Sequence, residues 1–150
     1  MSIRHFSFVV IALAVFAAGC SDSPATPTSP SSGGGSLALT SEQISGTWTL
    51  AAIQLAGQAA QSAPAGATYT LSFIDGRLST RADCNTCNGA FTLSGTTLNA
   101  GPALACTRAA CPTMAFESAY TGILAGEHTV SLVGGTLTLS SARGSLSFAR

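Results

Sequence analysis

Apolar residues alternate with small polar residues along most of the chain after residue 46. Segments 47–54 (TWTLAAIQ) and 68–74 (TYTLSFI) show this period of two, which returns in six further short segments. A period of two is typical of strands that bury one face. The further expected strands are 77–82, 90–93, 96–100, 128–133, 136–140 and 145–149.

Short connections that contain glycine separate several of these strands. Pairs of this kind close antiparallel hairpins, so the pattern predicts a meander of about eight strands. The connecting pairs are Asp75-Gly76, Ser94-Gly95, Gly134-Gly135 and Arg143-Gly144.

One segment, 111–127 (CPTMAFESAYTGILAGE), has the period of a helix instead. Its apolar residues fall on one face, and Gly126 fits a C-terminal cap. We therefore expect one α-helix between the fifth and sixth strands. Curling the sheet hides its edge strands, so the expected fold is mainly β, a small antiparallel barrel plugged or flanked by that helix. The apolar face consists of Phe116, Tyr120, Ile123 and Leu124.

The beginning of the chain, MSIRHFSFVVIALAVFAAGC, differs from the rest. Its apolar run, 8–18, is shorter than the roughly 20 residues of a membrane-spanning helix, which predicts a signal peptide over 1–19. The small residues before Cys20 resemble a bacterial lipobox, which implies cleavage after Gly19 and a lipid on Cys20. The alternative is an ordinary secretory signal with a coincidental cysteine.

Residues 20–40 are rich in Pro, Ser and Gly and contain no large apolar residue before Leu37. This composition cannot bury enough surface to offset the entropy of ordering, so we expect a disordered tether. The folded domain then spans 41–150. In the sorting rule that accompanies the lipobox, Asp directly after the lipidated cysteine favours the inner membrane. Ser21 stands there, so we expect the outer membrane, facing the periplasm or the cell surface.

Charged residues make up 8% of the chain, and none of them is lysine, which excludes a basic surface for nucleic acid. No GxSxG motif is present. The one histidine beyond the signal peptide, His128, is expected to be a solvated strand-end residue. Asp75 suits a tight turn, and Asp83 is expected to pair with Arg81 or Arg108. We therefore expect no catalytic residue, metal or cofactor, and a monomer.

Four cysteines of the domain, at 84, 87, 106 and 111, favour disulfides in an oxidising compartment. If 84–87 runs antiparallel to 106–111, the nested pairs Cys84–Cys111 and Cys87–Cys106 face each other, and the crossed pairing does not. A redox CxxC and a four-cysteine zinc site are the alternatives. The CxxC precedes an expected strand rather than a helix, and no Lys or His is near it, which disfavours redox chemistry. The spacing CxxxxC is wide for a zinc knuckle.

Three stretches are similar to the META domain family, which includes the bacterial heat-shock protein HslJ. They are SGTWTL (45–50), DCNTCNGAF (83–91) and LACTRAACP (104–112), the last followed by Phe116 and Glu117. The resemblance covers 42–150. It implies a lipocalin-like β-barrel with one helix, in an envelope protein associated with stress or drug tolerance. Cys87 and Cys106 depart from the family pattern. The positions that match it are Trp48, Cys84, Asn85, Gly89, Phe91, Thr107, Arg108 and Cys111.

Several of the matching positions also have a purely structural interpretation. Trp48 is expected in the core, and Asn85 and Gly89 are expected to provide turn geometry. Arg108 is expected to pack or to form a salt bridge, or with Thr107 to contact a partner.

The function expected from these observations is that of a lipid-anchored, non-catalytic envelope protein with a binding or stress/drug-tolerance role. It would act by binding or by physical presence, with an unknown envelope protein as the candidate partner. The alternatives are an inhibitor of an envelope or extracellular enzyme, such as a protease or lysozyme, and a carrier of a small apolar ligand inside a hollow barrel. An inhibitor needs a loop with an anchoring side chain. The long loop 54–68 holds no aromatic or charged residue.

Overall fold

A computed structural model describes residues 38–150 of the chain. The expected signal peptide, Cys20 and most of the expected tether lie outside these residues. Within them, no helix is long and apolar enough to cross a membrane.

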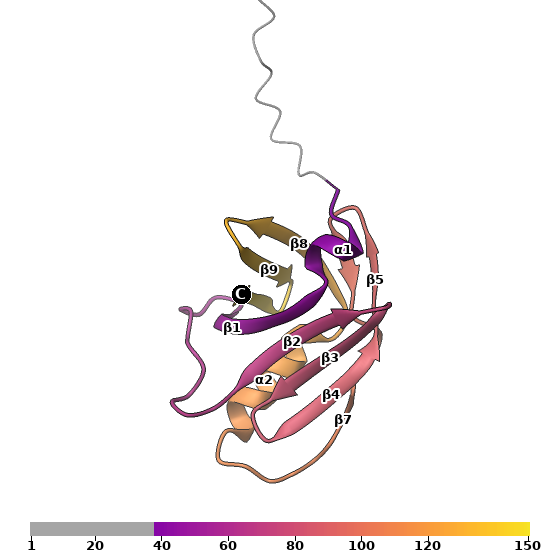
Figure 1. The fold of residues 1–150 in the computed structure, drawn as a ribbon. Helices are drawn as coiled ribbons and strands as arrows, with labels where there is room; N and C mark the ends of the chain where they lie inside the picture. The colour runs from indigo at the N-terminus through magenta and orange to yellow at the C-terminus, as the bar shows by residue number, and fades with distance from the viewer. Residues whose placement is uncertain (1–37) are drawn as a thin grey trace, which may run out of the picture. The chain divides into compact units, whose positions relative to one another are not determined.

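The described residues form two helices and ten strands, shown in Figure 1. The elements are α1 (Ser41–Ile44), β1 (Gly46–Leu55), β2 (Tyr69–Ile74), β3 (Arg77–Ala82), β4 (Asn85–Ala90), β5 (Thr92–Ser94), β6 (Thr97–Asn99), β7 (Ala105–Cys106), α2 (Met114–Leu124), β8 (Glu127–Val133), β9 (Thr136–Ser141) and β10 (Gly144–Ala149).

All ten strands belong to one antiparallel sheet, in the order β5-β6-β8-β9-β10-β1-β2-β3-β4-β7. β5 lies at one end of this order and β4 next to the other end, yet only Phe91 separates them in the chain. One residue spans at most about 3.6 Å, so the sheet must curl until its two ends meet. Figure 1 shows this curled sheet. The expected mainly-β, barrel-like fold with one main helix is confirmed.

The structure contains all eight expected strands and adds two, β4 and β7. The main helix consequently follows the seventh strand and not the fifth. β4 (NTCNGA) contains Asn and Gly, which are depleted in strands, so its sequence resembles a loop. β7 has two residues, too few to show any period.

Two positions show how glycine permits the strand connections. The β2–β3 turn places Asp75 at φ 49° and Gly76 at φ 73°, and positive φ at both central residues gives the twist of a two-residue hairpin. Gly144 has φ 140°, and a Cβ there would collide with the backbone of Gln54. The missing side chain lets β10 pair with β1 as far as Leu55.

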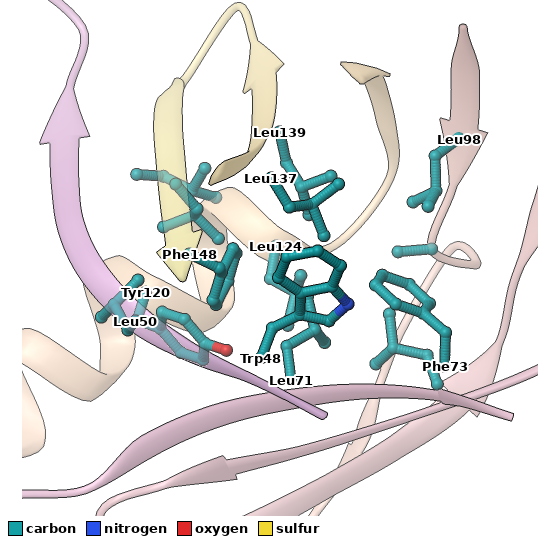
Figure 2. Close-up of a cluster of buried hydrophobic side chains, with 14 of the residues drawn as sticks. Trp48, Leu50, Leu71, Phe73, Leu98, Tyr120, Leu124, Leu137, Leu139 and Phe148 are labelled. Atoms are coloured by element: carbon teal, nitrogen blue, oxygen red, sulfur yellow. The ribbon is translucent and has the colours of Figure 1, made fainter. Parts of the chain in front are cut away.

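The interior of the curled sheet is filled by side chains. Trp48 is 1% exposed, and Figure 2 shows it among leucine and phenylalanine side chains from both halves of the sheet. Its Nε1 donates to the carbonyl of Ile44 at 2.7 Å, which attaches α1 to the core. The Arg150 guanidinium lies 4.0 Å from the centre of the Trp48 ring. The expectation that Trp48 is a core residue is confirmed.

Helix α2 packs against β1, β3 and β10 and buries Tyr120, Ile123 and Leu124. The Tyr120 hydroxyl lies 2.6 Å from Thr80 Oγ1, which itself donates to the Thr70 carbonyl at 2.6 Å. Tyr120 is therefore the donor of the first bond. The buried hydroxyl of Tyr120 on α2 therefore forms its hydrogen bond with a residue of the sheet.

Candidate functional site

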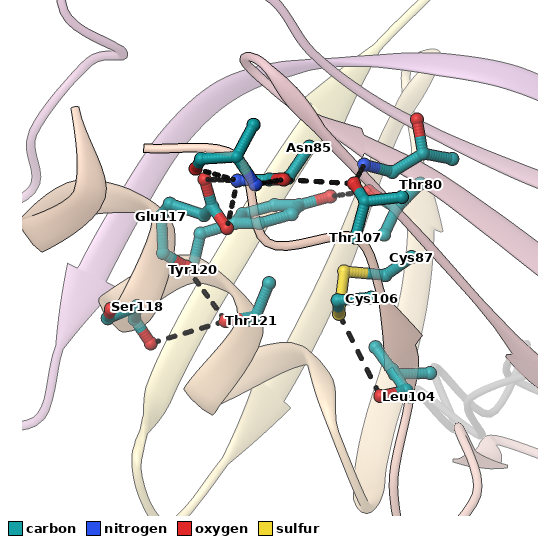
Figure 3. Close-up of a disulfide and its surroundings, with 12 residues drawn as sticks. Thr80, Asn85, Cys87, Leu104, Cys106, Thr107, Glu117, Ser118, Tyr120 and Thr121 are labelled. Carbon is teal, nitrogen blue, oxygen red and sulfur yellow. Dashed lines mark hydrogen bonds between the residues drawn. A yellow bond between two sulfur atoms is a disulfide. The ribbon is translucent and has the colours of Figure 1, made fainter. Parts of the chain in front are cut away.

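The buried side chain of Asn85 lies at the centre of a polar network at the start of β4. Its Oδ1 accepts hydrogen bonds from Thr107 Oγ1 at 2.9 Å and from the Ala109 amide at 2.7 Å. Its Nδ2 donates to the Ala109 carbonyl at 3.0 Å and to both carboxylate oxygens of Glu117, at 2.9 and 3.1 Å. Figure 3 shows Asn85 between Thr107 and Glu117. One amide thus connects β4, the segment after β7 and the first turn of α2.

The expectation that Asn85 and Gly89 provide turn geometry is wrong, because both lie within β4. Asn85 acts through its side chain. A Cβ on Gly89 would lie 2.7 Å from Leu104 Cδ2, so the glycine gives Leu104 room to pack against the strand. The left-handed residue of the β3–β4 turn is Asp83, with φ 56°.

Two disulfides flank this network, Cys84–Cys111 and Cys87–Cys106. Cys87 and Cys106 face each other in the β4–β7 register with their Cα atoms 4.0 Å apart, and the Cα atoms of the other pair are 6.4 Å apart. This is the nested arrangement expected for two antiparallel segments. Each cysteine of the CxxC motif therefore has its own partner outside the motif, so the motif does not form a redox pair here.

The carboxylate of Glu117 lies against the outer disulfide. Its Oε2 is 3.6 Å from Cys111 Sγ, and donor atoms of Cys84, Cys111 and Glu117 all lie within 4.8 Å of one another. This is the arrangement of side chains in the described residues that comes nearest to a metal-ligand set.

The carboxylate of Asp83 accepts a hydrogen bond from Thr113 Oγ1 at 2.5 Å, just before α2. Arg81 donates through Nε to the backbone carbonyl of Asp83 at 2.9 Å. Within residues 38–150, neither Arg81 nor Arg108 forms an ion pair with this carboxylate, so the expected pairing is wrong. The Asp83 carboxylate instead attaches the β3–β4 turn to the segment that precedes α2. Arg108 is exposed.

Two tyrosines lie beneath the network and remain neutral. The Tyr69 ring contacts Phe116 and Tyr120 edge to face, with centroid distances of 5.0 and 5.2 Å. Burial raises the pKa of Tyr69, and the negative charges of Asp83 and Glu117 raise it further. Burial also raises the pKa of Tyr120. Neither phenol is therefore available as a base.

His128 is buried at 1% exposure, so the expectation of a solvated histidine is wrong. Its Nε2 donates to the Leu124 carbonyl at the end of α2, at 2.9 Å, and leaves Nδ1 unprotonated. Burial lowers the pKa of His128, the Leu124 carbonyl opposes this shift, and nearby Arg143 adds to it. The signal in the sequence was the period of two, since His128 is in phase with the buried Val130.

An apolar cleft of about 300 Å³ lies between the end of β1, the β1–β2 loop and α2. Ile53 and Gln61 exchange two backbone hydrogen bonds of 2.8 Å, which fold the loop back onto the strand. One residue of the loop, Gln61, therefore lines the cleft. Sequence reasoning missed the cleft because it needs contacts between distant segments. Its lining residues are Ile53, Leu55, Gln61, Ala115, Phe116 and Ala119.

Comparisons with known proteins show the family and the fold of this chain. The model of the META domain family matches residues 38–150. An NMR structure of a protein from Burkholderia xenovorans is 26% identical, with a TM-score of 0.60 over 73% of this chain and 85% of that chain. A second NMR structure is 24% identical, with a TM-score of 0.58 over 74% and 94%, and is evidence for the fold alone. The comparison with curated proteins found no match.

Replacing Asn85 with alanine is expected to lower the free energy of unfolding by about 2–4 kcal/mol, because the network that joins β4 to the segment after β7 and to α2 loses its buried central amide. Urea unfolding with both disulfides closed measures this loss. The control is Asn88→Ala, an exposed asparagine of the same strand, with an expected effect within about 0.5 kcal/mol. Equal effects of the two variants would contradict the central role of the Asn85 amide.

The lowered pKa of His128 predicts that the free energy of unfolding falls as the pH decreases from about 7 towards 5. The unfolded chain takes up a proton near pH 6.5, and the folded chain only at lower pH. His128→Gln keeps a donor for the Leu124 carbonyl and removes this titration. Urea unfolding at pH 7 and 5.5 should show the loss in the wild type and not in the variant. A similar loss in both would assign the pH dependence to other groups.

Proposed function

The chain belongs to the META domain family, and we propose that it acts in the bacterial envelope as a lipid-anchored, non-catalytic binding module. The filled interior is the observation that carries this proposal. The buried polar side chains, Thr80, Asn85 and His128, each form hydrogen bonds within the fold. Because these side chains already have partners within the fold, we assign recognition to the outer surface.

We assign recognition to the apolar cleft beside α2. It is concave, and Gln61 of the long loop that could have carried an inhibitor's anchoring side chain lines it. This geometry favours a module that receives an apolar group of a partner over one that inserts an anchor into an enzyme. A carrier role would have to use the same cleft, because side chains occupy the sheet interior. Its volume of about 300 Å³ is at the lower limit for small-molecule sites.

The proposed place of action is the outer membrane. A lipid on Cys20 would anchor the chain, residues 20–40 would hold the domain clear of the membrane, and two disulfides suit an oxidising compartment. The family resemblance favours a role in tolerance of heat, antibiotics or envelope stress. The proposed partner is a protein of the envelope.

Cys20→Ser is expected to release the full-length protein from the membrane fraction, because the anchor would be the acyl chains on this residue. Fractionation of cells followed by intact-mass measurement tests this. The wild type should carry a diacylglyceryl mass and remain with outer membranes. A variant that still fractionates with membranes would refute lipid anchoring and leave the role of the cleft unaffected.

Ala119→Arg is expected to abolish the protection that the protein gives, because the long side chain fills the cleft. The measurement is survival of heat and antibiotic treatment in a strain that lacks the protein and is complemented with each variant. Ser118→Arg is the matched control, since it places the same charge on an exposed position of α2 outside the cleft lining. Equal protection by both variants, at equal protein levels, would refute recognition through the cleft.

A further inference from the structure

The outer disulfide and the neighbouring carboxylate can form a different kind of site when the disulfide is open. We propose that reduction of Cys84–Cys111 creates a site for one Zn²⁺ ion, held by Cys84 Sγ, Cys111 Sγ and the Glu117 carboxylate. The proposal is independent of the cleft and differs from a four-cysteine site, because Cys87 and Cys106 stay paired.

The ligand atoms are already close to the spacing that zinc requires. Tetrahedral zinc with bonds of about 2.3 Å to sulfur and about 2.0–2.2 Å to oxygen separates its ligand atoms by roughly 3.5–3.8 Å. Cys111 Sγ and Glu117 Oε2 are 3.6 Å apart, and the donor atoms of all three residues lie within 4.8 Å of one another. Opening the S–S bond therefore needs only a small separation of the two sulfur atoms.

The surroundings hold the carboxylate in place without neutralising it. Asn85 Nδ2 donates to both oxygens of Glu117, and Thr107 and Ala109 fix the Asn85 amide from the other side. A hydrogen-bonded second layer of this kind orients metal ligands. The carboxylate is partly buried, and no arginine within residues 38–150 pairs with it, which favours a cation beside it. The hydrogen-bonding arginines donate to backbone carbonyls instead, Arg81 to Asp83, Arg143 to Ala125 and Arg150 to Ser45.

The fold keeps the opened cysteines near each other. Cys87–Cys106 still joins β4 to β7, and Thr86 and Thr107 still exchange two hydrogen bonds of 3.0 Å. The segment that leads to Cys111 therefore stays beside the strand. Cys84 is exposed, so a reductant can reach the outer disulfide and solvent can supply the fourth zinc ligand.

A dithiol can act as the reductant that opens the outer disulfide. The dithiol gives two electrons and two protons to the Cys84–Cys111 bond and becomes a cyclic disulfide, leaving two thiols. Zinc then displaces the two thiol protons and binds the thiolates. Two sulfur ligands favour zinc over Ca²⁺ or Mg²⁺, which prefer oxygen.

The test uses the full-length lipidated protein in detergent, reduced with dithiothreitol, desalted without oxygen and mixed with Zn²⁺. Native mass spectrometry should show one zinc per reduced molecule and none on the oxidised protein. Zinc should protect Cys84 and Cys111 from alkylation. Glu117→Gln should weaken zinc binding at least tenfold in competition with a chelator, and the exposed control Glu127→Gln should not.

Several results would overturn the proposal. These are no zinc on the reduced wild type, equal affinity of the wild type and Glu117→Gln, and alkylation of Cys87 and Cys106 in the zinc-free reduced protein that zinc suppresses, which indicates a four-cysteine site. Circular dichroism of the reduced protein completes the test. Loss of the folded spectrum on reduction would also overturn the proposal, because the site requires Asn85 and Glu117 to stay in place.

Discussion

The one-residue connection between β4 and β5 is the constraint on which the fold depends. These strands lie towards opposite ends of the sheet order, and Phe91 alone joins them. Phe91 is buried, its amide donates to the Gly76 carbonyl at 3.0 Å, and its ring packs edge to face on Phe73 with a centroid distance of 4.9 Å. Because the chain crosses between the sheet ends at a buried residue, both halves of the sheet enclose the same core.

Several large side chains of the core pair their polar atoms with the backbone or with other side chains, whereas the Tyr69 hydroxyl and His128 Nδ1 are buried without a partner among the described residues. Trp48 donates to the Ile44 carbonyl, His128 to the Leu124 carbonyl, and Tyr120 to Thr80. Each partner belongs to a helix end or to a strand that the side chain packs against. These bonds remove the cost of burying polar groups and fix α1, α2 and β8 on the sheet. The interior of the sheet is thereby occupied by side chains that stabilise the fold.

The sequence predicted the parts of the fold that follow from local patterns. Alternation of apolar and polar residues located eight strands, because a strand buried on one face requires it. Asp75-Gly76 located a hairpin, because the turn requires residues that tolerate positive φ. β4 and β7 show no such pattern. The Cys87–Cys106 disulfide and the Asn85 side chain, which hold this part of the sheet together, involve residues distant in the sequence. The partners of Asn85 that lie on β7's flank and on α2 are 22 and 32 residues away. Beside a cysteine, such an asparagine looks like a turn residue.

Three residues in the first two turns of α2 contribute to three different parts of the molecule. Phe116 lines the apolar cleft, Glu117 accepts from Asn85 beside the outer disulfide, and Tyr120 enters the core one turn later. Cys111 holds the chain to the β3–β4 turn three residues before the helix begins. The first turn of α2 therefore contributes both to the cleft and to the network beside the Cys84–Cys111 disulfide. Since Tyr120, Ile123 and Leu124 are buried, the core holds the later part of the helix, while the disulfide and the Asn85 amide hold its beginning.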